Sequence, residues 1–102
     1  MMFTVYIIYS HSLDSFYRGQ TNNILERIKR HNSGSEKFTK SGIPWKLIWT
    51  TEKQNRGEAL ILERKLKNLS RIRLMEFMLK YKEGFINEEV EAIINGFLNK
   101  NN

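Results

Sequence analysis

Two runs of β-branched and aromatic residues, close together near the N-terminus, constrain the fold most strongly. Residues 3–9 (FTVYIIY) and 16–21 (FYRGQT) have the composition of strands. Because only a short polar stretch ending at residues 13–15 separates them, we expect the two to pair as an antiparallel hairpin. Gly19 interrupts the second run, and a glycine inside a strand indicates a bulge or a close approach of the backbone to another group.

The rest of the chain predicts one further strand and four helices. Residues 45–51 (WKLIWTT) have the composition of a third strand. Helix starts are marked by an asparagine followed three residues later by glutamate, or by another polar capping residue. The predicted helices cover 23 to about 32, 56–68, 71 to about 81 and 88–98, with caps at Asn23 or Asn22, Asn55, Ser70 and Asn87. The order β-β-α-β-α-α-α predicts an α+β fold, with a three-stranded sheet against helices.

Length and composition limit the class of protein. A chain of 102 residues has room for one hydrophobic core, so we expect a single domain at 1–98 and a frayed, asparagine-rich tail at 99–102. There is no run of about 18 apolar residues and no export signal, so we expect a cytoplasmic protein without a membrane segment. The lack of cysteine excludes disulfides, thiolate nucleophiles and thiolate zinc sites, and leaves oxygen as the ligand for a hard metal ion.

Charge is unevenly distributed along the chain. The formal net charge is +6, but residues 1–82 hold 16 Lys and Arg against 7 Asp and Glu. The last twenty residues hold Lys100 against four glutamates. A basic body suits a polyanionic partner such as nucleic acid. Moderate basicity is also common in proteins with no such partner.

Glu63 lies beside the apolar stripe of the predicted helix 56–68. That stripe consists of Ala59, Leu62, Leu66 and Leu69. A carboxylate close to the core side of a helix costs several kcal/mol unless it is paired or binds a cation. Two interpretations remain open: a glutamate at the edge of the stripe that pairs with Arg or Lys, and a metal ligand that faces the sheet.

Arg27 and His31 are four residues apart on the first predicted helix, so they share a face with Ile24 and Ile28. A guanidinium binds phosphate through two hydrogen bonds, and an imidazole can exchange a proton near neutral pH. The pair therefore suits a phosphate site. It also fits an ordinary solvated basic helix.

Aromatic residues leave two further choices open. Tyr6 and Tyr17 lie on the two strands of the hairpin and could bring their hydroxyls to one site, although strand tyrosines more often pack half-buried. Phe38 and Trp45 flank the end of the polar loop at 33–44. These two could stack on an unpaired base, or pack into the domain.

The same residues occur in the order of a known pattern. Thr4-Val5-Tyr6 is followed by Tyr17-Arg18-Gly19 and Gln20-Thr21, then by Arg27-x-x-x-His31-Asn32 and Glu58-Ala59-x-x-x-Glu63. This pattern resembles that of the GIY-YIG nuclease superfamily. It looks most like the small single-domain bacterial proteins similar to the nuclease subunit of the eukaryotic structure-specific resolvase. The likeness runs from about Val5 to Leu69 and on to Arg71; Thr4 stands in place of the family's glycine, and Arg18 in place of its isoleucine.

The resemblance implies a central three-stranded antiparallel sheet flanked by helices, and a catalytic set of Tyr6, Tyr17, Arg27, His31 and Glu63 with Gly19 as a structural glycine. Glu63 is expected to bind one Mg²⁺ or Mn²⁺ ion. Tyr6, assisted by His31 or Tyr17, is expected to take a proton from the attacking water, and Arg27 to neutralise charge that builds up on the phosphate.

These expectations predict a metal-dependent DNA endonuclease in DNA repair or processing. It would select DNA by shape, branched or single-stranded, rather than by sequence. The residues expected to contact the DNA backbone are Lys29, Arg30, Lys37, Lys40, Lys46, Arg64, Lys65 and Lys67. Two alternatives remain: a nucleic-acid-binding protein with little or no turnover, and an interaction module whose acidic last helix docks a protein partner.

Overall fold

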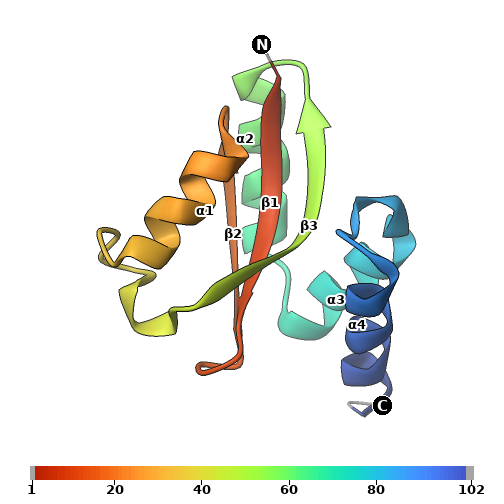
Figure 1. Cartoon of the computed structure of the whole chain (residues 1–102). Coiled ribbons are helices and arrows are strands. Elements are labelled where there is room, and N and C mark those ends of the chain that lie inside the picture. The colour runs from red at the N-terminus through yellow and green to blue at the C-terminus, as the bar shows by residue number, and fades with distance from the viewer. Residues whose placement is uncertain (1, 101–102) are drawn as a thin grey trace.

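The computed structural model describes residues 2–100 and has the predicted order of elements (Figure 1). The strands are β1 (Phe3–Ser10), β2 (Ser15–Thr21) and β3 (Trp45–Lys53). The helices are α1 (Ile24–Ser33), α2 (Arg56–Lys67), α3 (Arg71–Lys80) and α4 (Glu88–Lys100), with short 3-10 turns η1 (Lys40–Gly42) and η2 (Lys82–Gly84). The predicted three-stranded antiparallel α+β fold is confirmed.

The hairpin β1–β2 forms as expected, and β1 is the central strand of a sheet with the order β2-β1-β3. Both neighbours pair with β1 in the antiparallel sense, so that Tyr6 lies opposite Gly19 on one side and Thr50 on the other. A register shift between Ile7 and Ile8 interrupts the pairing with β3. With partners on both sides, β1 leaves β2 and β3 as the two edge strands.

Two separate cores cover the two faces of the sheet. On one face, Tyr6, Ile8 and Trp45 pack against Ile24 and Ile28 of α1. The other face carries the larger core, which α2, α3 and α4 complete; its fully or nearly buried members include Val5, Ile7, Trp49, Ala59, Leu66, Leu74, Met75, Met78 and Ile94. Burial on both faces explains why residues 5–8 are continuously apolar instead of alternating.

Side-chain caps fix where the helices begin. Asn23, not Asn22, caps α1: its Oδ1 accepts from the backbone N–H of Glu26 at 3.2 Å. The same contact recurs from Asn55, Ser70 and Asn87 at the starts of α2, α3 and α4, at 2.9, 3.2 and 2.9 Å. Each cap satisfies a backbone donor that has no partner within its helix.

The last helix closes the larger core. Ile94 of α4 is buried, and Val90, Phe97 and Leu98 pack beside it. The helix continues through Lys100, two residues beyond the predicted domain boundary at 98, and a lysine in the last turn is favourable at the negative end of the helix dipole. Asn101 and Asn102 of the predicted tail lie outside the described residues. Before α4, Phe85 forms an antiparallel bridge with Trp49, and Ile86 N–H donates to Ile48 O at 3.1 Å.

None of the helices within residues 2–100 is long and apolar enough to cross a membrane.

Candidate active site

Tyr6 and Gly19 form a cross-strand pair at the centre of the site. Tyr6 is fully buried, and its ring lies over Gly19. A Cβ atom placed on residue 19 would lie 2.4 Å from the Tyr6 hydroxyl oxygen and 2.6 Å from Cζ. The Tyr6 side chain therefore occupies the space that a side chain at residue 19 would need. This close packing explains why a glycine lies inside strand β2.

The Tyr6 hydroxyl begins a buried chain of hydrogen bonds. Tyr6 Oη lies 2.8 Å from His31 Nε2, and His31 Nδ1 lies 3.0 Å from Thr39 Oγ1. His31 and Thr39 are each only 1% exposed. Burial, reinforced by the positive charge of Arg27, lowers the pKa of His31 below its ordinary value. The imidazole is therefore neutral near pH 7, with one nitrogen that carries a proton and one that accepts.

Burial and three neighbouring side chains set the pKa of the same hydroxyl. Burial is the main reason that the pKa of Tyr6 rises to about 12. The Arg27 guanidinium beside the hydroxyl opposes this rise in pKa, whereas Tyr17 and Glu63 add to it. The Tyr17 and His31 rings also form a T-shaped pair, with 5.1 Å between the ring centroids. Tyr6, Tyr17, Arg27 and His31 thus lie together, and Glu63 is close enough for its charge to raise the pKa of Tyr6.

Arg27 has donor capacity to spare. Its Nη1 lies 3.9 Å from Glu36 Oε1, and its buried Nε has no hydrogen-bond partner. A buried polar atom without a partner is rare and calls for an explanation, such as an absent ligand. Arg27 also lines a small depression of about 100 Å³ between β2 and α1, together with Thr21 and Arg30. An anion would complete its hydrogen bonds.

Glu63 lies on α2, across the edge of β2 from α1. Its side chain is 16% exposed, and Oε2 lies 3.1 Å from Lys67 Nζ. Both residues line a depression of about 200 Å³ with Leu60 and Arg64. The ion pair fits the first interpretation of Glu63, as a paired glutamate. Among residues 2–100 there is no group of three or more His, Asp or Glu that could hold a metal.

Comparison with known proteins decides the family. The model of the GIY-YIG catalytic domain matches residues 2–76. The chain belongs to the GIY-YIG family. A UPF0213 protein of Clostridium perfringens is 41% identical over 59 residues, which cover 57% of this chain and 63% of that protein. Another, from Bacillus licheniformis, is 38% identical over 76 residues, which cover 74% and 70%.

A solved structure of the same group has a similar fold. The solution NMR structure of a UPF0213 protein from Bacillus halodurans matches with a TM-score of 0.50 at 33% identity, and the match covers 82% of this chain and 87% of that one. The family match places the five residues around Tyr6 in a nuclease-type domain. The name UPF0213 itself states no activity.

The predicted DNA contacts of this GIY-YIG domain divide into two groups. Six lie on α1, on the loop after it, or beside Glu63: Lys29, Arg30, Lys37, Lys40, Arg64 and Lys67. All six are exposed, although Arg30 pairs with Glu36 at 3.0 Å and Lys67 pairs with Glu63. Arg30 lines the depression that contains Arg27, and Arg64 and Lys67 line the one that contains Glu63.

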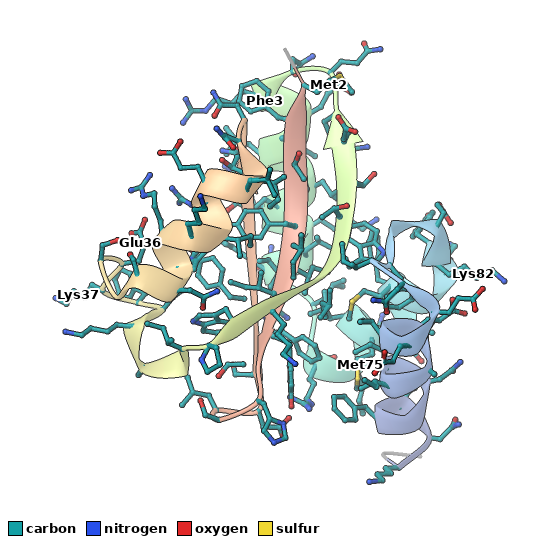
Figure 2. All side chains as sticks on the ribbon, viewed as in Figure 1. Met2, Phe3, Glu36, Lys37, Met75 and Lys82 are labelled. Carbon is teal, nitrogen blue, oxygen red and sulfur yellow. The ribbon has the colours of Figure 1, made fainter. Side chains whose placement is uncertain are left out.

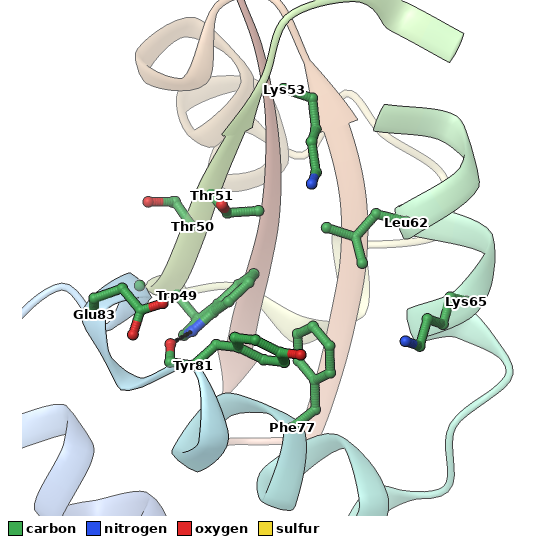
Figure 3. A pocket seen from close by; sticks show the side chains of 10 residues that line it. Trp49, Thr50, Thr51, Lys53, Leu62, Lys65, Phe77, Tyr81 and Glu83 are labelled. Atoms are coloured by element: carbon green, nitrogen blue, oxygen red, sulfur yellow. Dashed lines mark hydrogen bonds between the residues drawn. The ribbon is translucent and has the colours of Figure 1, made fainter. Parts of the chain in front are cut away.

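Lys65 and Lys46 belong to other surfaces. Lys65 lies over the Phe77 ring, 5.8 Å from its centroid, and lines a pocket of about 400 Å³ with Trp49 and Tyr81 (Figure 3). Lys46 lines an apolar groove beside α4. Neither lysine lines the depressions around Arg27 and Glu63, because each side chain points toward the face that carries the larger core.

Sequence reasoning missed Thr39 and Glu36, and gave Asn32 no role of its own. Thr39 hydrogen-bonds to His31, and Glu36 pairs with Arg27 and Arg30. Asn32 holds the start of β3 in place, because it accepts from Trp45 N–H at 2.6 Å and donates to Trp45 O at 3.0 Å. The position of Asn32 next to His31 is the one sequence signal that could have pointed to Asn32. Glu36 and Thr39 lie in a loop without a periodic pattern, so the sequence gives no signal for them.

Arg18, which replaces the family's isoleucine, has a structural contact. Its Nη2 donates to Leu69 O at 3.2 Å, which ties β2 to the end of α2.

Proposed function

We propose that this GIY-YIG domain is a metal-dependent DNA endonuclease that hydrolyses phosphodiester bonds. The observation that carries the proposal is the buried Tyr6 hydroxyl, hydrogen-bonded to a neutral His31 and adjacent to Arg27. A phenol in that position, with a proton acceptor on one side and a cation on the other, is equipped to move a proton next to a phosphate.

Proton transfer follows the direction of the hydrogen bonds. With Nδ1–H donating to Thr39 Oγ1, the lone pair on Nε2 of His31 is free to accept from Tyr6 O–H. As the Tyr6 oxygen takes a proton from the attacking water, its own proton passes to His31. A pKa of about 12 keeps Tyr6 a neutral phenol near pH 7, so it works as a relay and not as a standing phenolate.

Arg27 supplies the positive charge for the transition state. Its unpartnered Nε–H and its Nη atoms can hydrogen-bond to the phosphate that is being attacked. As charge grows on the phosphate oxygens, this interaction strengthens more than it does in the ground state.

Glu63 is the residue that would hold the divalent ion. Its shielded carboxylate offers oxygen, which Mg²⁺ and Mn²⁺ prefer, and one or two carboxylates plus phosphate and water are a common Mg²⁺ ligand set. The donor set therefore fits one ion, provided that Lys67 moves aside. A bound ion supplies a Lewis acid that stabilises charge on phosphate oxygens.

The DNA contacts favour recognition by shape. Lys29, Arg30, Lys37, Lys40 and Arg64 can reach phosphates, and such contacts carry no sequence information. They predict binding that weakens steeply as salt increases. We propose a role for the protein in DNA repair or processing inside the cell, on branched or single-stranded DNA.

One observation favours a second candidate, a DNA-binding protein with little turnover. Both key charges are already engaged within the chain, Arg27 with Glu36 and Glu63 with Lys67. If substrate and metal displace these partners poorly, the domain binds DNA and cleaves it slowly.

A cleavage panel distinguishes the two candidates. Purified protein with Mg²⁺ or Mn²⁺ is incubated with single strands, flaps, forks and junctions, beside the variants Tyr6→Phe, Arg27→Ala and Glu63→Ala. Arg73→Ala and Glu76→Ala are matched controls, since both are exposed residues on α3. The endonuclease proposal expects cleavage by the wild type and the controls and losses of at least about 100-fold in the other three. No cleavage with either metal, or full activity of Glu63→Ala, contradicts it.

The pH dependence gives an independent check. The relay needs neutral His31, whose pKa is lowered. The rate should therefore stay on its plateau as the pH falls through about 6.5, the ordinary histidine value, and decline only below it.

A further inference from the structure

The loop between α1 and β3 presents one aromatic side chain almost entirely to solvent. Phe38 is 87% exposed, whereas Trp45, the other aromatic residue of this region, is 5% exposed and donates its Nε1–H to Thr39 O at 2.6 Å. The two aromatic residues therefore differ in their surroundings: Trp45 packs into the domain, and Phe38 does not. A single exposed apolar residue is ordinary on a protein surface, so its position has to carry the argument.

Both ends of this short segment are attached to the candidate active site. Before Phe38, Glu36 pairs with Arg30 at 3.0 Å and faces Arg27 at 3.9 Å. After it, the buried Thr39 hydroxyl hydrogen-bonds to His31 at 3.0 Å. The backbone between them is closed by Lys40 N–H donating to Glu36 O at 3.0 Å. Phe38 thus lies, with its ring exposed, on a segment whose residues on either side contact Arg27 and His31.

The charges around Phe38 select the kind of partner. Lys37 and Lys40 are both exposed on either side of it, and Figure 2 shows Lys37 pointing away from the body of the domain, beside Glu36. An aromatic ring between two cations matches a chain of alternating bases and phosphates. Proteins that bind single-stranded nucleic acid use this combination, in which a base stacks on the ring and the cations contact the backbone.

We propose that Phe38 is a stacking platform for an unpaired base next to the scissile phosphate, and that it makes DNA with unpaired nucleotides the preferred substrate class. The inference rests on the proposed function, because it takes DNA as the substrate. Bases within a duplex already stack on one another and present no free ring face, so only an unpaired or displaced base can use the platform. Blunt duplex is left with the phosphate contacts alone.

Binding without cleavage tests the platform. The protein is titrated, in EDTA and at one fixed salt concentration, into a blunt DNA duplex and into the same duplex with a single-stranded arm. A single 2-aminopurine in the arm reports stacking through its fluorescence, and anisotropy gives both dissociation constants. The variants are Phe38→Ala, Phe38→Leu and Phe38→Trp, with Ile93→Ala on α4 as the control for loss of an exposed apolar residue.

The wild type should bind the armed DNA more tightly than the duplex and change the 2-aminopurine fluorescence. Phe38→Ala and Phe38→Leu should weaken binding to the armed DNA by about 5- to 100-fold, leave duplex binding within about twofold, and remove the fluorescence change. Phe38→Trp and Ile93→Ala should behave as the wild type. Phe38→Leu separates stacking from general apolar contact, because it keeps a large apolar side chain but has no ring.

Equal affinity of the wild type for both DNAs overturns the inference, as does an equal loss of affinity for both in Phe38→Ala. Phe38-dependent binding to vesicles of phosphatidylglycerol and phosphatidylcholine, with no change in 2-aminopurine fluorescence, would also overturn it in favour of a membrane contact. Cleavage separates this inference from the proposed function. If both DNAs are cleaved independently of Phe38, the stacking platform is contradicted and the endonuclease proposal is supported. If binding depends on Phe38 but no DNA is cleaved in Mg²⁺ or Mn²⁺, the endonuclease proposal is contradicted and the stacking platform is supported.

Discussion

Replacing Gly19 with alanine tests the packing at the centre of the candidate active site. The new methyl group would lie 2.4, 2.6 and 3.0 Å from Oη, Cζ and Cε1 of Tyr6. Contacts below 3.0 Å are not tolerated, so the ring or the backbone of β2 has to move. The Tyr6 ring is fully buried and its hydroxyl is held by His31, so it has no free space to enter.

The expected cost follows from these contacts. Overpacking a filled core costs about 1–3 kcal/mol, and loss of the Tyr6–His31 hydrogen bond adds about 1 kcal/mol. Alanine also lowers the conformational entropy of the unfolded chain, which stabilises the folded state by about 0.4–1 kcal/mol and offsets part of this cost. The net expectation is a decrease of about 1–3 kcal/mol in the free energy of unfolding. A shift of about 1 Å in the hydroxyl should reduce cleavage by about 100-fold.

Gly96→Ala is the matched control. Gly96 lies in α4, where an added Cβ would meet nothing within 4 Å. Alanine in a helix is favoured over glycine by about 0.5–1 kcal/mol, so this variant should be more stable than the wild type and fully active. Urea unfolding followed by circular dichroism measures both stabilities. If Gly19→Ala unfolds at the same urea concentration as the wild type and cleaves as well, the assignment of Gly19 as space for Tyr6 is refuted.

Three further outcomes follow from the site. The pKa of Tyr6 is raised from 10.0 to about 12 in the folded state, so the native protein holds a proton that the unfolded chain releases. The free energy of unfolding should therefore fall by roughly 2–3 kcal/mol as the pH rises from 10 to 12. Urea unfolding measures this decrease, which Tyr6→Phe should lack. Lys67→Met removes the cation beside Glu63, so Mn²⁺ should bind a few-fold more tightly by calorimetric titration, and an unchanged affinity would show that Lys67 does not compete. Asn32→Ala breaks both hydrogen bonds to the Trp45 backbone and should cost about 1–3 kcal/mol in unfolding, a loss that Ser33→Ala, at an exposed neighbour, should not reproduce.

The sequence predicted the elements well because local chemistry determines them. The helices begin at Asn23, Asn55, Ser70 and Asn87, where a polar side chain caps the first turn. The strands follow from β-branched and aromatic runs. The ends of the strands differ from the prediction by a residue or two. Lys53, for example, belongs to β3 because it pairs with Phe3 of β1.

The grouping of the candidate site residues was predicted in outline, and their catalytic roles stay predictions. What was missed depends on contacts made through the loop between α1 and β3. Spacing alone singled out Glu63 and placed Arg27 with His31, and the family pattern added the tyrosines. Thr39 reaches His31 only because the loop folds back over α1. Burial likewise distinguished Phe38 from Trp45, because the Trp45 ring is held in the domain by the hydrogen bond from its Nε1–H to Thr39 O.

The segment between η2 and α4 has a consequence for aggregation. An exposed edge strand offers unpaired N–H and C=O groups to another chain. At β3, the chain covers part of its own edge, through the bridge between Phe85 and Trp49 and the hydrogen bond from Ile86 to Ile48. A protein shortened after Tyr81 would therefore lose the core contacts of α4 and also expose β3 to intermolecular pairing. Its precipitation would report an unprotected strand, even where the three-stranded sheet still forms.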